Sequence, residues 1–157
     1  MKEELIQKLI QQLSHSITEL DTYIASTQEE AIQAPGAMQS QHDTTKREAG
    51  YRMNELVERR AYLTQSMKTI VEYISHIPHT QTHITLGSYV TTQDIQDNKK
   101  NYFILPAGEG EIIEKEDISH HIFILSPRSP LFSLLEGKTL GATYVFRDIL
   151  FTIVDIQ

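Results

Sequence analysis

Acidic side chains lie on both sides of a break in the sequence pattern. Glu29 and Glu30 precede the segment Gln33–His42, in which a Pro-Gly pair interrupts helix formation, and Asp43 and Glu48 follow the pair. One carboxylate can complete the oxygen shell of a metal ion while another orients or deprotonates an attacking water. The same acids also fit a structural role, because a capping box ends at Glu48 and Glu29-Glu30 is typical of a solvated helix face. Both interpretations stay open at this point.

Two segments that flank this break carry apolar residues at alternating spacings of three and four, which is the pattern of a heptad seam. The first seam runs from Ile6 to Ile24, and the second runs from Met53 to Ile77. Each seam predicts a long helix that needs a partner. A short break between two such helices favours an antiparallel arrangement, because a short loop makes neighbouring helices run in opposite directions.

We therefore predict an antiparallel coiled-coil hairpin over residues 1–77, with its tip near 33–43. Helices of about 30 residues would be roughly 45 Å long. Two helices bury only a seam, so any functional residues are expected at an end or along a face. Arg60 interrupts the second seam, and we expect it to turn outward or to pair with Glu19 or Asp21.

The hydrophobic period shortens after a polar linker predicted over residues 78–83. A short helix over 130–135 follows from Ser129 as its cap and Gly137 after its end. The chain is thus predicted to be α+β, with a sheet domain over 84–157. β-branched and aromatic runs indicate the strands of one antiparallel sheet: 84–90, 101–105, 122–125, 143–146 and 150–156.

Composition narrows the function classes further. The chain has 157 residues and a formal net charge of −7, which disfavours a protein that neutralises a phosphate backbone, so we expect no sequence-specific DNA binding. Because the chain has no cysteine, disulfide bonds, zinc sites with thiolate ligands and a catalytic cysteine nucleophile are excluded. The N-terminus begins an amphipathic pattern instead of a continuous apolar block. A cytoplasmic protein without a membrane span is the expectation.

Histidines offer a second kind of candidate chemistry. His76, His79 and His83 lie within a short stretch, and His120-His121 follow. A proline interrupts the first group, and the carboxylates that usually support a metal site are not apparent nearby. We therefore expect no stable metal site formed by these residues.

Proline and serine in the second half could suggest an active loop, but a scaffold fits better. Ser126, Pro127, Ser129 and Pro130 lie between a predicted strand and a capped helix, where two prolines fix the chain. The sequence contains none of the common hydrolase, zinc-protease or phosphate-binding motifs. A self-contained enzyme is not expected, and prolyl isomerase activity is disfavoured because the aromatic residues fit a core and no Trp is present.

Three stretches resemble the Gre family of bacterial transcript-cleavage factors. Ser126–Gly141 is similar to the family's C-terminal signature, in which a Ser-Pro-x-Ser-Pro-Leu turn leads to a helix ending in Leu-Leu-x-Gly-Lys. Leu86–Val90 resembles the strand that opens the same domain, and Ser40–Tyr51 resembles a stretch of a divergent branch. The resemblance implies an FKBP-like C-terminal domain that docks on RNA polymerase. The residues that it assigns to docking are Ser126, Pro127, Ser129, Pro130 and Leu131.

The resemblance also implies a role for the hairpin. In such factors the hairpin enters the secondary channel of RNA polymerase, and acidic residues at its tip help to hold a Mg²⁺ ion at the polymerase active site. The tip residues implied here are Asp43 and Glu48, with Glu29 and Glu30 as second choices. The chain would then need no cofactor of its own, because the metal would be shared with the polymerase.

This chain departs from the usual cleavage motif. When the tyrosine of that motif is aligned with Tyr51, Thr44 and Arg47 occupy positions where the family has acids. Asp43 and Glu48 are each displaced by one residue, which turns a side chain by about 100° around a helix. We expect a monomeric Gre-like elongation factor. The alternatives are a channel-occupying inhibitor or competitor without cleavage activity, and a chaperone-like or structural adaptor.

Overall fold

The computed structural model describes residues 1–33, 42–78, 80–108, 110–114 and 121–157. Two compact units divide the chain. One consists of Met1–Leu9 together with Lys68–Gln157, and the other consists of Ile10–Met67. The predicted boundaries of hairpin, linker and sheet domain at residues 77 and 83 stay a prediction.

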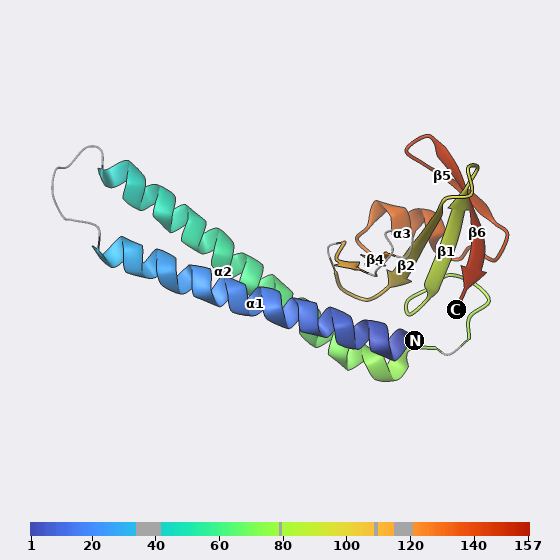
Figure 1. Cartoon of the computed structure of the whole chain (residues 1–157), viewed down its shortest axis with the longest axis horizontal. Coiled ribbons are helices and arrows are strands. Elements are labelled where there is room, and N and C mark those ends of the chain that lie inside the picture. Colours follow the sequence, from blue (N-terminus) through green and yellow to red (C-terminus); the bar gives the residue numbers. More distant parts are fainter. Residues whose placement is uncertain (34–41, 79, 109, 115–120) are drawn as a thin grey trace. The chain divides into compact units, whose positions relative to one another are not determined.

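Two long helices make up most of the first half. Helix α1 spans Lys2–Gln33, and helix α2 spans His42–Tyr73. At 1.5 Å rise per residue each 32-residue helix is roughly 48 Å long. In the unit Ile10–Met67 they run side by side in opposite directions, as Figure 1 shows. The predicted tip residues 34–41 lie outside the described residues.

Helix α2 ends where the sequence predicts a stop. A single turn of 3₁₀ helix, η1, spans Ile74–His76, and Ile77 then adopts an extended conformation immediately before Pro78. The residue before a proline disfavours helical dihedral angles, which explains why the helical pattern ends here.

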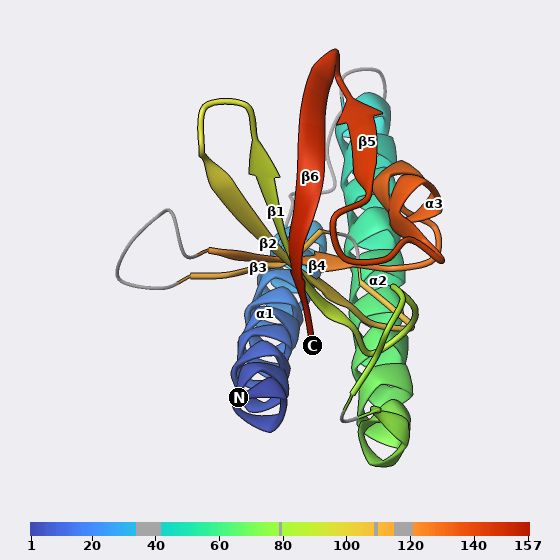
Figure 2. The same cartoon turned by 90° about the vertical axis from the view of Figure 1, so that its right-hand side faces the viewer.

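Within the described residues, six strands form one sheet in the order β3-β4-β2-β1-β6-β5. The short helix α3, Pro130–Leu135, lies beside the edge strand β5 (Figure 2). The strands are β1 Tyr89–Asp94, β2 Lys99–Ile104, β3 Ile112–Ile113, β4 Ile122–Leu125, β5 Thr143–Phe146 and β6 Ile149–Ile156.

The main core cluster joins one face of the sheet to α3. Helix α3 contributes Leu131, Phe132 and Leu135, all of them buried. Strands β2 and β6 contribute every second residue, as the two-residue period of a strand requires: Tyr102 and Ile104, and Phe151 and Ile153. Within this core the hydroxyl of Tyr144 donates to Oγ1 of Thr92 at 3.2 Å, so a buried polar pair is satisfied.

The predicted sheet is correct in kind and wrong in three details. Strands β2 and β4 pair in parallel, although we predicted a wholly antiparallel sheet. The dipeptide strand β3 was missed, because two residues show no periodicity. Residues 84–88 are not part of β1: Ile84 exchanges backbone hydrogen bonds with Gly137 and Lys138, and Gly87 at φ +81° turns the chain.

The fold class is therefore confirmed as α+β, with two long helices followed by a mostly antiparallel sheet and one short helix. In the described part of the chain, no helix is long and apolar enough to cross a membrane.

Candidate functional site

The predicted tip acids lie close to the loop ends of α1 and α2. Glu29 and Glu30 occupy the last two turns of α1, and their side chains are exposed. Glu48 lies in the second turn of α2 and is also exposed. Asp43 is the second residue of α2, and its side chain lies outside the described residues. At least three carboxylates are thus presented to solvent near this end.

A contact between the helices shows which residues of α1 lie opposite the acids of α2. Nε of Arg60 donates to Oδ1 of Asp21 at 2.5 Å, and Nη2 donates to Oδ2 at 3.3 Å. Counting along both helices from this pair places Glu48 level with Gln33, roughly 4–5 Å further toward the loop than Glu30. The pairing with Asp21 confirms one of the two partners predicted for Arg60.

The same contact shifts the pKa of both groups in the direction that favours their charged forms. The hydrogen bond from Arg60 lowers the pKa of Asp21, and that hydrogen bond raises the pKa of Arg60. Both side chains remain close to half exposed, at 43% for Arg60 and 49% for Asp21. Water screens a pair of this kind, so its main effect is geometric.

The backbone positions of the two predicted acids of α2 do not lie on one face of the helix. Asp43 and Glu48 are five residues apart, which corresponds to about 140° around a helix and roughly 7.5 Å along it. A second helix or a partner protein must supply the other oxygens of any metal site, since Mg²⁺ prefers six. Among the described residues no group of three or more His, Cys, Asp or Glu could hold a metal ion. The donor set fits one or two carboxylate ligands added to an ion held elsewhere.

The serine–proline turn connects β4 to α3, as the sequence predicts. The backbone N–H of Ser129 donates to the carbonyl of Ser126 at 2.9 Å, and Pro130 is the first residue of α3. Ser129 is the N-cap residue, but its side chain makes no capping hydrogen bond. Ser126 and Leu131 are buried, whereas Pro127 and Pro130 are exposed. A docking role for this turn stays a prediction, and the exposed prolines are the members that a partner could reach.

The histidines that the structure describes do not form a recognisable site. His76 and His83 are exposed, and His79 and His120 lie outside the described residues. His76 stacks against Tyr73 with ring centroids 6.3 Å apart, which is a structural contact at the end of α2.

The exposure of several apolar residues was not predicted from the sequence. Ile32 is 82% exposed and Tyr51 is 63% exposed, and both lie near the loop ends of the two helices. Their exposure could have been predicted from the sequence, because neither residue occupies a position of the heptad seams. On the sheet, Val145 pairs with Leu150 across β5 and β6, and both are exposed. Strand periodicity alone does not reveal which sheet face stays uncovered.

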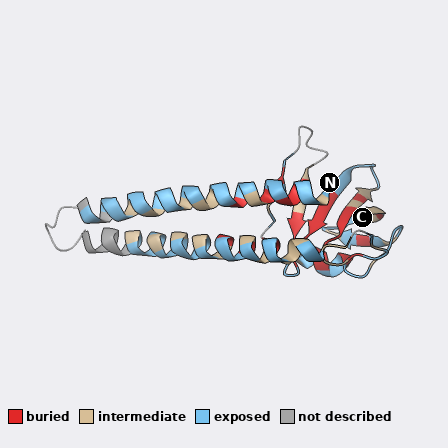
Figure 3. Ribbon diagram, turned by 90° about the horizontal axis from the view of Figure 1, so that it is seen from below, coloured by how far each residue is buried: buried red, intermediate tan, exposed pale blue. Residues whose placement is uncertain are grey.

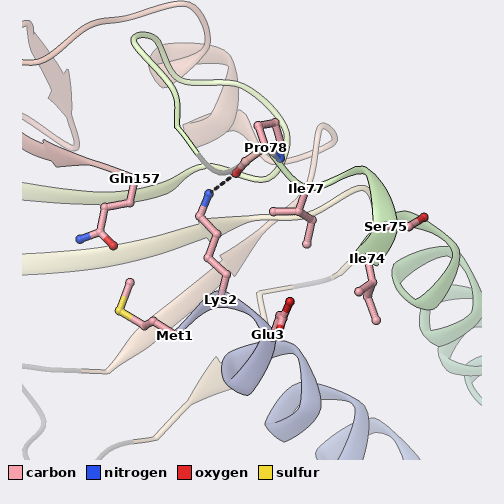
Figure 4. A pocket seen from close by; sticks show the side chains of 8 residues that line it. All are labelled: Met1, Lys2, Glu3, Ile74, Ser75, Ile77, Pro78 and Gln157. Carbon is pink, nitrogen blue, oxygen red and sulfur yellow. Dashed lines mark hydrogen bonds between the residues drawn. The ribbon is translucent and has the colours of Figure 1, made fainter.

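A cavity of about 500 Å³ lies in the unit that contains the sheet, where α1 begins and η1 ends (Figure 4). Nζ of Lys2 donates to the carbonyl of Pro78 at 2.9 Å, and partial burial lowers the pKa of Lys2. None of the residues predicted to be functional lines this cavity. Its lining consists of Met1, Lys2, Glu3, Ile74, Ser75, Ile77, Pro78 and Gln157.

No protein-family model matches the sequence, and no curated protein matches it. Among solved structures, a structure of the transcription factor Gfh1 is 18% identical, with a TM-score of 0.38, and covers 96% of this chain and 92% of its own. The crystal structure of Thermus aquaticus Gfh1 is 14% identical, with a TM-score of 0.36, and covers 98% of this chain and 92% of its own. These TM-scores are too low to establish a shared fold, so the functional argument rests on the residues of this chain.

Proposed function

We propose that this protein is a Gre-like accessory factor that binds RNA polymerase and acts through the loop end of its helical hairpin. In this proposal the hairpin enters the secondary channel and modulates elongation or stimulates transcript cleavage. The polymerase performs the chemistry, and this chain supplies carboxylates in the cytoplasm where transcription takes place.

The observation that carries the proposal is the exposure of Glu29, Glu30 and Glu48 near the free end of two paired helices. Two paired helices of roughly 48 Å each form a slender element whose loop end could enter a narrow opening and deliver these groups there. A carboxylate delivered there could complete the coordination of a polymerase-bound Mg²⁺ ion or orient a water molecule. The sequence resemblance of Ser126–Gly141 supports the same partner.

The placement of the acids determines which activity is favoured. The backbone positions of Asp43 and Glu48 lie about 140° apart around α2, which does not favour a single ion held by these two residues alone. Glu48 and a carboxylate of α1 are the more plausible pair, because they belong to neighbouring helices at similar levels. If no such pair forms in the channel, the hairpin would occupy the channel without stimulating cleavage.

The test uses a backtracked RNA polymerase complex with Mg²⁺, in which shortened RNA is measured with and without this protein. Glu48→Gln and Asp43→Asn remove one carboxylate each while keeping a similar size. Glu58→Gln is the matched control, since Glu58 is an exposed acid of the same helix that lies about 15 Å further from the loop. We expect stimulated cleavage that falls at least tenfold in Glu48→Gln and stays within twofold in Glu58→Gln.

The other outcomes separate the alternatives. Binding to polymerase with slower elongation and no cleavage would identify a channel-occupying inhibitor or competitor. Failure of the wild-type protein to bind polymerase would refute the proposal and leave the adaptor alternative, for which the exposed pair Val145 and Leu150 would be the first surface to test.

A further inference from the structure

Arg60 occupies an unusual position in the hairpin. It lies four residues after Leu56 and three before Leu63, which places a charged side chain within an otherwise apolar seam. A single polar residue at a seam position reduces the apolar contact between helices, and in coiled coils it can specify how the helices align. In the structure Arg60 reaches across to α1 and donates two hydrogen bonds to Asp21.

The contact that Arg60 makes is directional. Nε and Nη2 each donate to a different carboxylate oxygen of Asp21, at 2.5 Å and 3.3 Å. Such a fork requires the planar guanidinium and the carboxylate to lie at the same level and in the same orientation. A slip of one helical turn, about 5.4 Å, would break both hydrogen bonds.

The sequence of α1 provides no carboxylate to replace Asp21 after such a slip. The residues three and four positions away in either direction carry no charge, and the nearby Glu19 lies about 160° around the helix from Asp21. Arg60 would therefore lose its carboxylate partner in either slipped alignment. The residues at the slipped positions are Ile17, Thr18, Ile24 and Ala25.

Apolar packing specifies the alignment only on one side of this pair. Leu13 and Leu63 are buried, at 3% and 4% exposure. From Asp21 to the loop in α1, and from the loop to Arg60 in α2, none of the described side chains is buried (Figure 3). The half-buried residues there are few, namely Ile24 and Thr27 in α1 and Ala49, Met53 and Leu56 in α2, so apolar contact gives little support to one particular alignment.

We propose that the Arg60–Asp21 fork sets the axial alignment of α1 against α2 in the half of the hairpin that leads to the loop. Arg60 is thus a positioning residue, which fixes how the carboxylates at the loop end of α1 lie relative to those of α2. The alignment itself is independent of what the hairpin binds. Its consequence for transcription rests on the proposed function.

The test measures the distance between spin labels on the two helices by pulsed electron paramagnetic resonance. Gln28→Cys and Asn54→Cys place the labels at exposed positions on the loop side of the fork, and the chain has no native cysteine. We expect one narrow distance distribution when Arg60 is present. Arg60→Leu is expected to broaden it or to add a second distance shifted by about 5 Å, while the melting temperature stays equal or rises.

Two further variants keep the test decisive. Arg60→Lys retains the positive charge and the aliphatic stem but loses the fork, so it should also broaden the distribution. Lys68→Leu is the matched control, because it removes a cation of α2 whose carboxylate partner, Glu72, belongs to the same helix. Its distribution should match that of the wild type.

A wild-type distribution in both Arg60→Leu and Arg60→Lys would overturn the proposal. The polymerase assay is read separately: if the wild-type protein fails to bind polymerase, the proposed function fails and the distance result still decides the alignment. If it binds, Arg60→Leu should lower the maximal effect on the transcript at least threefold while binding stays within twofold.

Discussion

Substitution of Gly87 by alanine should destabilise the unit that contains the sheet through two separate effects. The first is backbone strain, because Gly87 has φ +81°, a conformation that L residues adopt at a cost of about 1–2 kcal/mol. The second is steric, because a Cβ atom would lie 2.9 Å from Cδ of Pro78 and 3.3 Å from the hydroxyl of Tyr73. The proline ring is rigid and cannot move out of the way by rotation. Overpacking of this kind costs about 1–3 kcal/mol, so the total loss should be about 2–5 kcal/mol.

Gly141 provides a closely matched control. Its φ is +80°, its N–H donates to a backbone carbonyl at 2.8 Å as that of Gly87 does, and a Cβ atom there would meet nothing within 4 Å. Gly141→Ala should therefore cost only the strain, about 1–2 kcal/mol. Both variants restrict the unfolded chain equally, so this contribution cancels in the comparison.

The assay is equilibrium unfolding in urea, followed by circular dichroism and by tyrosine fluorescence, since the chain has seven Tyr and no Trp. Gly87→Ala should lose about 1–3 kcal/mol more than Gly141→Ala, with an unchanged dependence on urea concentration. Equal losses in the two variants would refute the steric part of the reasoning. They would mean that the linker at Pro78 adjusts freely to a methyl group.

Two more predictions concern the buried tyrosines. Tyr144→Phe removes the donor to Thr92 and leaves that buried hydroxyl with one partner fewer, so the free energy of unfolding in urea should fall by about 1–2 kcal/mol. Thr92→Val should then cost less stability in the Tyr144→Phe background than it does in the wild-type protein. Burial raises the pKa of Tyr102 above its ordinary value of 10.0, so the folded state keeps its proton where the unfolded state begins to lose it. The contribution of Tyr102 to the free energy of unfolding should be constant below about pH 10 and should fall as the pH rises further. Urea titrations between pH 9 and 11 should therefore show a shallower loss of stability in Tyr102→Phe than in the wild-type protein. An unchanged slope would show that Tyr102 does not control the alkaline limb.

The sequence predicted the long-range order of the chain well where a period was repeated many times. The seams from Ile6 to Ile24 and from Met53 to Ile77 contain enough turns for a helical period to be unmistakable, and both helices are present. Arg60 was predicted to turn outward or to pair with Glu19 or Asp21, because a charged side chain in a seam must reach either water or a partner. The choice of Asp21 over Glu19 was left open, although the seam contains a signal for it: Asp21 flanks the seam residues Leu20 and Ile24, whereas Glu19 lies about 160° around the helix from Asp21.

The sheet was predicted less completely, because pairing joins residues that are distant in the sequence. The runs 101–105 and 122–125 read equally well as parallel or antiparallel neighbours, and only the path of residues 105–121 decides between them. Ile84 has the composition of a strand residue, but its backbone hydrogen bonds go to Gly137 and Lys138. At the candidate site Glu29, Glu30 and Glu48 lie near helix ends and their role stays a prediction, whereas the exposure of Ile32 and Tyr51 could be foreseen only from their absence from the seams.

Burial along α1 connects the stability of the hairpin with its proposed role. Leu5, Ile6, Leu9 and Leu13 are buried, whereas no described side chain from Ser14 to the end of α1 is buried. Helical propensity alone does not hold such a segment firmly in water, so the loop half of the hairpin depends on few apolar contacts and on directional links such as that of Arg60. If burial were the main requirement, Ile32 and Tyr51 would be expected in the seam and Arg60 outside it. The observed pattern is the opposite: Arg60 lies in the seam, and Ile32 and Tyr51 lie outside it. This pattern fits a hairpin whose loop end keeps a defined alignment of its helices and leaves its apolar and acidic side chains exposed for a partner.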